Sequence, residues 1–146
     1  MAMLPFCGYH MADYWQHWLD MGDRGGDKMP KVFYVNWFRQ GSDGHWLWPG
    51  FGENSRVLKW VCERCDGKAD AVETPIGHLP TPEALDLDGL DIPDADLAEL
   101  LEVDAARWLQ QVPAFREHYA RFGDKLPKRL ADQLDQLEQR LKSAKA

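Results

Sequence analysis

Large aromatic side chains are crowded into the first half of this sequence. Seven Trp, six Phe and four Tyr occur among 146 residues, and six of the seven Trp lie at or before Trp60. Rings of this size need cover from other structure or from a ligand, because each buries about 150–250 Å². The first half is therefore expected to pack tightly or to bind a flat molecule.

Charge is distributed unevenly. Residues 1–68 are neutral overall, whereas residues 69–146 carry the net charge of −7. A protein that follows a phosphate backbone needs clustered Lys and Arg, so nucleic acid is not an expected partner. No apolar run approaches the roughly 18 residues of a membrane span, so no membrane partner is expected either. Three Cys, an odd number, indicate a reducing compartment, and the expected location is cytoplasmic.

The expected fold class is mixed α/β, helix-rich with a few strands. Apolar residues at helical spacing predict a helix over Met11–Met21, which Gly22 with Gly25 and Gly26 ends in a loop. The β-branched and aromatic run KVFYVNWF predicts a strand over Lys31–Phe38, and His45–Trp48 is a candidate for a short return strand.

A second helix is predicted over Arg56–Cys65, with Asn54 or Ser55 as its N-cap. The Pro-rich residues 74–94 are expected to be irregular. Two or three helices are predicted to close the chain, roughly at Asp94–Leu101, Ala105–Phe122 and Pro127–Lys142. The last of them carries a leucine stripe (Leu130, Leu134, Leu137 and Leu141), which is typical of a docking face.

Residues with catalytic or metal-binding chemistry are scattered. Cys62 and Cys65 form a CxxC pair, which raises the hypothesis of a small structural zinc protein. No second such pair follows, and both lie within a predicted helix, so incidental cysteines are the stronger interpretation. The five His have no catalytic spacing. No catalytic residue and no metal ligand is therefore assigned in this chain.

One stretch, Asn36–Arg56 (NWFRQGSDGHWLWPGFGENSR), combines rings, glycines and an amide. Aromatic faces can sandwich a flat heterocycle, and stacking contributes about 1–3 kcal/mol per base. The Asn54 amide can donate and accept at a purine edge, and Gly50 and Gly52 allow close approach of the backbone. Composition alone favours the alternative, an aromatic hairpin packed into its own core.

Longer segments resemble the C-terminal portion of the GTP-dependent phosphoenolpyruvate carboxykinase family. The segments are AMLPFCGYHMADYWQHWL (Ala2–Leu19), PKVFYVNWFR (Pro30–Arg39), LWPGFGENSRVLKW (Leu47–Trp60) and TPIGHLP (Thr74–Pro80). They occur in the family's order, and LWPGFGENSR is too long for a chance match.

The resemblance implies a GTP site in which aromatic rings enclose guanine and the Asn of the motif lies at its edge. Carried over by motif position, the guanine-binding residues are Phe38, Trp46, Phe51, Gly52, Glu53 and Asn54. The family commonly has Phe where this chain has Trp46, and an indole keeps the aromatic face while enlarging it. GTP and GDP are the expected ligands.

The resemblance also implies a lyase of gluconeogenesis, a decarboxylase that converts oxaloacetate and GTP to phosphoenolpyruvate, GDP and carbon dioxide. The family uses Mn²⁺ or Mg²⁺, but its metal ligands and phosphate loop lie upstream of the region that this chain resembles. We therefore expect a C-terminal fragment with the guanine site and without the catalytic centre, inactive alone, whose partner is the missing N-terminal part. The apolar start at Met1 fits a chain that begins inside a domain.

Two parts of one domain are expected. Residues 1–80 would form its aromatic-rich guanine-binding part, and residues 81–146 its acidic helical C-terminal region. The alternative hypothesis is a stand-alone module that binds a nucleotide or a protein without catalysis.

Overall fold

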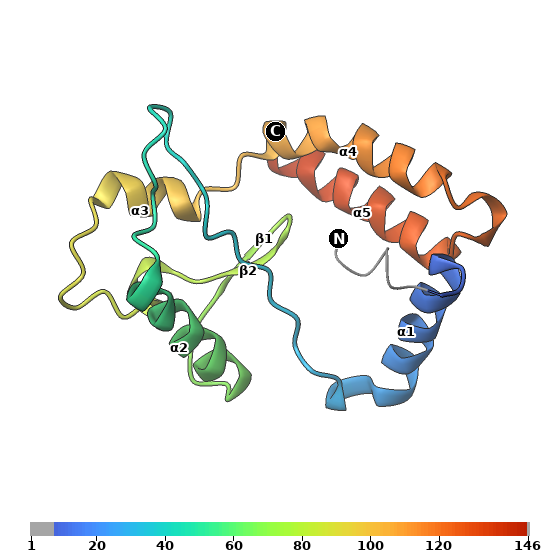
Figure 1. The fold of residues 1–146 in the computed structure, drawn as a ribbon, viewed down its shortest axis with the longest axis horizontal. Helices are drawn as coiled ribbons and strands as arrows, with labels where there is room; N and C mark the ends of the chain where they lie inside the picture. Colours follow the sequence, from blue (N-terminus) through green and yellow to red (C-terminus); the bar gives the residue numbers. More distant parts are fainter. Residues whose placement is uncertain (1–7, 146) are drawn as a thin grey trace. The chain divides into compact units, whose positions relative to one another are not determined.

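The computed structural model describes residues 8–145, which are mainly helical and include one two-stranded antiparallel sheet (Figure 1). The elements are α1 (Met11–Gly25), α2 (Asn54–Cys65), β1 (Val72–Thr74), β2 (Gly77–Leu79), α3 (Asp94–Leu101), α4 (Ala105–Ala120) and α5 (Lys128–Lys145). This content agrees with the expected helix-rich, mixed α/β class. The apolar start predicted at Met1 lies outside the described residues.

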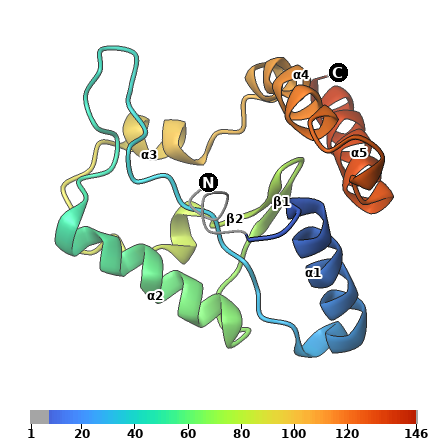
Figure 2. The same ribbon diagram turned by 45° about the vertical axis from the view of Figure 1, so that its right-hand side comes forward.

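Contacts divide the chain into two units, and the first combines the residues up to Pro30 with those from Asp104 onward. Its helices α4 and α5 lie side by side (Figures 1 and 2). Leu134 and Leu141 of α5 are buried, as is Val112 of α4. The leucine stripe of α5 is thus a docking face within the chain itself, because two of its four members are buried.

Aromatic rings join α1 to α4 in this first unit. The Trp15 ring lies 4.6 Å from the Phe122 ring and 5.9 Å from the Tyr119 ring, centroid to centroid, at steep interplanar angles. Such edge-to-face pairs add about 0.5–1.5 kcal/mol beyond the area they bury. The aromatic side of the predicted first helix is therefore used for packing.

The second unit, Lys31–Val103, has a core of its own. Trp60 of α2 is buried with Leu85 and with Leu97 of α3. The Trp60 indole donates a hydrogen bond to the carbonyl oxygen of Asp70 at 3.1 Å, so its polar edge is satisfied. The Phe33 ring packs edge-on against Trp60 at 5.9 Å, which attaches the extended chain before the site to this core.

The strand predicted over Lys31–Phe38 is wrong for this structure. The ribbon of residues 31–36 runs without a turn (Figure 1), but within residues 8–145 no strand pairs with them, and the sheet consists of β1 and β2. Alternate side chains do face opposite ways, since Phe33 packs inward while Val32 and Tyr34 are 92% and 93% exposed. Strand propensity reflects a fit to a paired, half-buried surface, and nothing in the described chain supplies that surface here.

The return segment and the Pro-rich region also differ from prediction. His45–Trp48 forms no strand, only an isolated antiparallel bridge between Gln40 and Trp46. Residues 74–94 are less irregular than expected, because Thr74 ends β1, which pairs with β2 through the register Val72 with Leu79.

The predicted helices are confirmed with small shifts at their ends. Helix α1 continues past Gly22 and ends where Gly26 takes a positive φ of 50°. Helix α2 begins at Asn54, and neither Asn54 nor Ser55 caps it. The Ser55 hydroxyl instead donates to the carbonyl oxygen of Gly52 at 2.6 Å, and the Asn54 side chain is used elsewhere.

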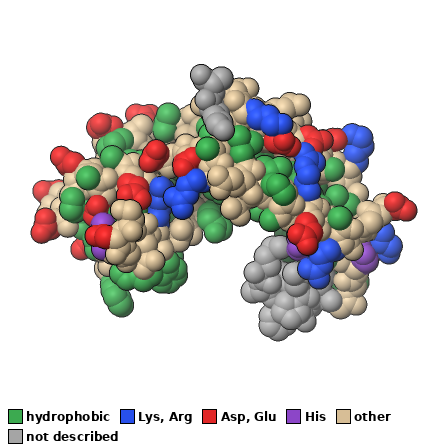
Figure 3. All heavy atoms as spheres, turned by 90° about the horizontal axis from the view of Figure 1, so that it is seen from above, with side chains coloured by type: hydrophobic (Ala, Val, Ile, Leu, Met, Phe, Trp, Pro, Cys, Tyr) green, Lys and Arg blue, Asp and Glu red, His purple; other side chains and the backbone are tan. Residues whose placement is uncertain are grey.

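Hydrophobic side chains reach the surface between charged ones, as the space-filling view in Figure 3 shows. Trp18 and Leu58 are about half exposed. None of the described helices combines the length and the apolarity needed to cross a membrane.

Candidate functional site

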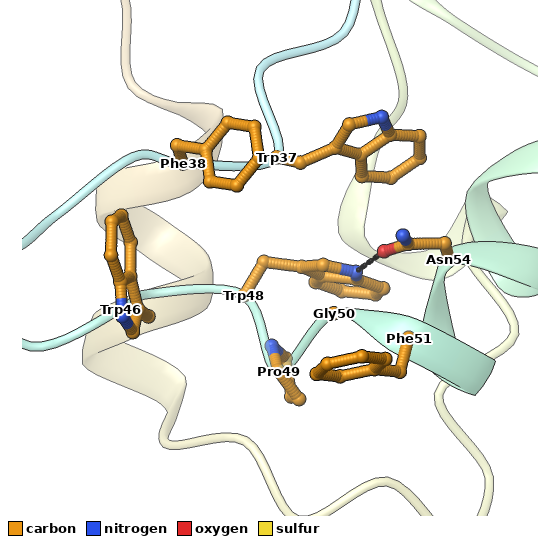
Figure 4. A pocket seen from close by; sticks show the side chains of 8 residues that line it. All are labelled: Trp37, Phe38, Trp46, Trp48, Pro49, Gly50, Phe51 and Asn54. Carbon is orange, nitrogen blue, oxygen red and sulfur yellow. Dashed lines mark hydrogen bonds between the residues drawn. The ribbon is translucent and has the colours of Figure 1, made fainter.

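A cavity of about 390 Å³ opens in the second unit, a size within the range of about 300–1,000 Å³ typical of small-molecule sites. Its lining, shown in Figure 4, consists of Trp37, Phe38, Trp46, Trp48, Pro49, Gly50, Phe51 and Asn54. Five aromatic rings and one amide therefore converge on one space. This is the composition expected of a site for a flat, polar-edged ligand.

Residues 36–47 double back on themselves, and this segment is called the hairpin below. It brings the rings of Phe38 and Trp46 together. The Asn36 side chain accepts a hydrogen bond from the Phe38 backbone N–H at 3.0 Å, which fixes the turn into the hairpin. The Leu47 N–H then donates to the Arg39 carbonyl oxygen at 3.1 Å. As a result the centroids of the Phe38 and Trp46 rings lie 6.0 Å apart, and the two rings meet edge to face at an interplanar angle of 71°. Both rings stay exposed, at 73% and 55%.

Burial and a hydrogen bond hold Leu47 and Trp48 in place. Leu47 is buried, and Trp48 is only 6% exposed. The Trp48 indole N–H donates to Oδ1 of Asn54 at 3.0 Å, drawn as the dashed line in Figure 4. Because an indole N–H can only donate, the amide oxygen must face it, and the amide NH₂ points away from Trp48. The bond thus orients Asn54 with its two donor hydrogens available for a ligand.

Phe51 occupies a backbone conformation that costs energy. Its φ is 47°, in the left-handed region, and among the described residues it is the one non-glycine with a positive φ. For a residue with a Cβ this costs about 1–2 kcal/mol. Yet its ring is 96% exposed, so no burial within the chain offsets that cost. Strain held at an exposed aromatic ring is typical of a ligand-contacting position.

Gly50 makes this geometry possible. Its own φ is 78°, a conformation that glycine adopts without penalty. The two successive left-handed residues turn the chain sharply from Pro49 into the short turn Phe51–Glu53, which leads directly into α2. The ring of Phe51 is thereby held at the edge of the cavity beside Pro49 (Figure 4).

The remaining predicted residues lie next to the cavity without lining it. Of the six, the structure places Phe38, Trp46, Phe51 and Asn54 in the lining, and Gly52 and Glu53 outside it. The Glu53 carboxylate forms an ion pair with Arg56, whose Nη1 also donates to the Asp86 carbonyl oxygen at 2.7 Å. Gly52 accepts the hydrogen bond from Ser55 described above. Both residues therefore hold the turn in place.

Pro49 lines the cavity, a role that was not predicted for it from the sequence. Its position inside the segment LWPGFGEN, between Trp48 and Gly50, was the available indication. Trp37 and Trp48 belong to the aromatic stretch singled out from composition, and they join the lining as well.

The described residues offer no place that fits a divalent metal. Within residues 8–145 no group of three or more His, Cys, Asp or Glu side chains is arranged to hold one. Cys62 and Cys65 are exposed free thiols on α2. The Mn²⁺ or Mg²⁺ implied by the resemblance therefore finds no ligand set in this part of the chain.

Comparison with known proteins decides the family. The profile of the phosphoenolpyruvate carboxykinase C-terminal P-loop domain matches residues 1–140. The chain belongs to the GTP-dependent phosphoenolpyruvate carboxykinase family. The resemblance found in the motifs is thus confirmed, and this membership favours the enzyme-derived interpretation over a stand-alone module.

The carboxykinase relatives are much longer than this chain. Phosphoenolpyruvate carboxykinase [GTP] of Neocallimastix frontalis is 55% identical over 145 residues, which is 98% of this chain and 24% of the relative. The protein of the same name from Renibacterium salmoninarum is 54% identical over 142 residues, covering 97% and 23%. That of Corynebacterium glutamicum is 51% identical over 146 residues, covering 100% and 24%. The chain therefore spans about a quarter of the length of the curated relatives it matches.

Proposed function

We propose that this chain forms the guanine-recognition part of the GTP site of a phosphoenolpyruvate carboxykinase. One observation carries the proposal: the exposed rings of Phe38, Trp46 and Phe51 line the same cavity as an Asn54 amide whose orientation is already set. A stacked base would cover these rings and gain about 1–3 kcal/mol from stacking. All the lining residues fall within 1–80, which supports assigning the guanine-binding part to that range.

The orientation of Asn54 supplies a preference for guanine. Its oxygen is bonded to the Trp48 indole, so the amide NH₂ is the group that meets the ligand. Guanine presents an acceptor, O6, where adenine presents a donor, its amino group. Two donors placed against each other leave both unpaired, which costs about 1–3 kcal/mol for each buried group. Adenine nucleotides would therefore bind more weakly.

The rest of the reaction is assigned to the part of the enzyme that this chain does not include. We propose that the complete protein, a lyase of gluconeogenesis, converts oxaloacetate and GTP to phosphoenolpyruvate, GDP and carbon dioxide. A Mn²⁺ or Mg²⁺ bound by that other part would supply charge neutralisation for phosphoryl transfer. No described cluster of residues fits that metal, so the chain by itself is expected to be inactive. Exposed free thiols on α2 suit a reducing compartment such as the cytoplasm.

The remaining part of the enzyme is also the proposed partner of this chain. The extended residues 31–36 present Val32 and Tyr34 to solvent and have an unpaired backbone within the described chain. A neighbouring strand is added through the backbone N–H and C=O groups along the edge of an extended segment, and these edges of residues 31–36 are open within the described chain. We propose that the N-terminal part supplies this strand.

A titration with GDP and then ADP, followed by tryptophan emission, tests the guanine site. Trp37, Trp46 and Trp48 lie in the lining, so a stacked base should quench their emission. We expect saturable quenching by GDP. ADP should bind at least about tenfold more weakly, because adenine cannot accept the hydrogen bond from the Asn54 amide. Equal affinity for the two nucleotides, or no response to either, would overturn the proposal.

Asn54→Asp is the sharpest variant for this test. A carboxylate keeps an oxygen to accept from the Trp48 indole but has no hydrogen to donate to guanine O6. GDP should bind about 5- to 150-fold more weakly, corresponding to about 1–3 kcal/mol, and the preference over ADP should shrink or reverse. Gln111→Glu, the same amide-to-carboxylate change at an exposed position of α4 outside the lining, is the matched control and should keep the preference of the wild type.

A further inference from the structure

The hairpin that carries two walls of the cavity is attached to helix α3 at two points. Near the beginning of α3, Nε2 of His45 lies 3.0 Å from a carboxylate oxygen of Asp96. Near its end, Nη1 of Arg39 donates to the carbonyl oxygens of Leu100 and Glu102 at 3.2 and 3.4 Å. Helix α3 therefore serves as the support on which the hairpin rests.

The two attachments differ in how they respond to pH. A guanidinium stays protonated throughout the accessible range, and its place at the last carbonyls of a helix suits the helix dipole. An imidazole changes its charge near neutral pH. Of the two contacts, the one through His45 is the one that titrates.

Both ring nitrogens of His45 face carboxylates. Nδ1 contacts Asp43 in the turn, and Nε2 contacts Asp96 on α3. A neutral imidazole has one N–H and one lone pair, so it can donate to only one of them, whereas the imidazolium donates to both. The arrangement is therefore complete only when His45 is protonated.

Electrostatics agrees with this geometry. The hydrogen bond to Asp43 and then that to Asp96 raise the pKa of His45 above its ordinary value, and the charges of the same two carboxylates act in the same direction. His45 likewise lowers the pKa of Asp43. Because the pKa of His45 is higher in the folded state, the contact contributes fully below the pKa of an unfolded imidazole. It is lost as the pH rises through the folded value.

The His45 ring lies close to Gly41 on the opposite arm of the hairpin. A Cβ added at Gly41, across the hairpin, would lie 2.7 Å from Cε1 of His45 and 3.3 Å from a methyl group of the buried Leu47. The imidazole thus lies directly on the backbone of the opposite arm. The next residue, Trp46, places its ring against Phe38 in the wall of the cavity.

We propose that His45 is a positioning residue for the base. Its imidazolium holds the hairpin to α3 through Asp96 and so determines the position of the Trp46 ring in the wall of the cavity. Binding of the base then weakens as His45 loses its proton. This inference rests on the proposed guanine site and adds to it a dependence on pH.

The test is GDP affinity from about pH 5.5 to about pH 8.5, the range in which histidine titrates. Wild type, His45→Gln and His78→Gln are compared with the same ligand, so that titration of the GDP phosphates is common to all three. His78, an exposed residue of β2 outside the lining, is the matched control. As the pH rises over this range, the GDP affinity of wild type and of His78→Gln should fall about two- to fivefold more than that of His45→Gln. This is the size expected for an exposed charged contact.

The outcomes separate the two proposals. If wild type does not bind GDP at any pH, the guanine site is wrong and this inference falls with it. If wild type binds and His45→Gln has the same pH profile, the guanine site stands and the role of His45 is wrong. Nuclear magnetic resonance titration of His45 in wild type and in Asp96→Asn adds a readout independent of GDP. An unchanged midpoint in the variant would overturn the contact with α3.

Discussion

Replacing Phe51 by Gly and by Ala separates the strain of the backbone from the contribution of the ring. Both variants remove a side chain that is 96% exposed, so neither loses core packing. They differ in the Cβ, which at a φ of 47° costs about 1–2 kcal/mol. Glycine also has greater freedom in the unfolded chain, which lowers the stability of the Gly variant by about 0.5–1 kcal/mol and offsets part of this difference. The Gly variant should therefore be about 0.5–1 kcal/mol more stable than the Ala variant.

Ligand binding should respond differently. Both variants lose one stacking surface, worth about 1–3 kcal/mol, so GDP should bind about 5- to 150-fold more weakly to each. Phe51→Trp keeps an aromatic face and should bind GDP at least as well as the other two variants. Phe51→Gly should thus be more stable than Phe51→Ala and yet bind GDP more weakly than wild type. This combination is what we expect where strain is maintained for contact with a ligand.

Urea unfolding followed by circular dichroism measures the first effect, with the slope m checked to be unchanged between variants. Tryptophan quenching by GDP measures the second. If Phe51→Ala is as stable as Phe51→Gly, the strain inferred from the backbone angle is wrong. If both variants bind GDP like wild type, the ring does not contact the base.

Two further predictions concern the packing of the first unit and the absence of the catalytic centre. Leu141→Ala should destabilise the α4–α5 pair by about 2–5 kcal/mol, because the Leu141 side chain is fully buried. Leu58→Ala, at a half-exposed position of α2, should change stability by about 0.5 kcal/mol or less, and similar urea midpoints for the two variants would contradict the packing described. The purified chain should show no phosphoenolpyruvate formation from oxaloacetate and GTP with Mn²⁺ present, and measurable turnover would show that the catalytic groups are in this chain after all.

Much of the helical structure could be predicted because its determinants are local. The limits of α3 match the prediction, and those of α5 differ by a few residues, since apolar spacing and flanking prolines act within a few turns. The strand over Lys31–Phe38 could not be judged in the same way. Its residues have high strand propensity, but a strand exists only where a second backbone pairs with it.

The site was predictable in its residue types and less so in their roles. The motif LWPGFGENSR located the stretch around Phe51 and Asn54 that lines the cavity. Asn54 was expected as an N-cap or as a reader of the base, and the structure shows a third role, accepting from the Trp48 indole. That contact joins residues six apart across a turn with two positive φ angles, which no propensity describes.

By itself the sequence determined the family, the positions of the helices and the residues available for a base-binding site, because motif identity and helical periodicity are properties of short segments. Only the tertiary structure decided that the rings of Phe38, Trp46 and Phe51 remain exposed around one cavity instead of packing into a core. It also brought His45 to Asp96, 51 residues away on α3. Exposure and such distant pairs depend on which other segments fill the surrounding space, and that is settled only when the chain has folded.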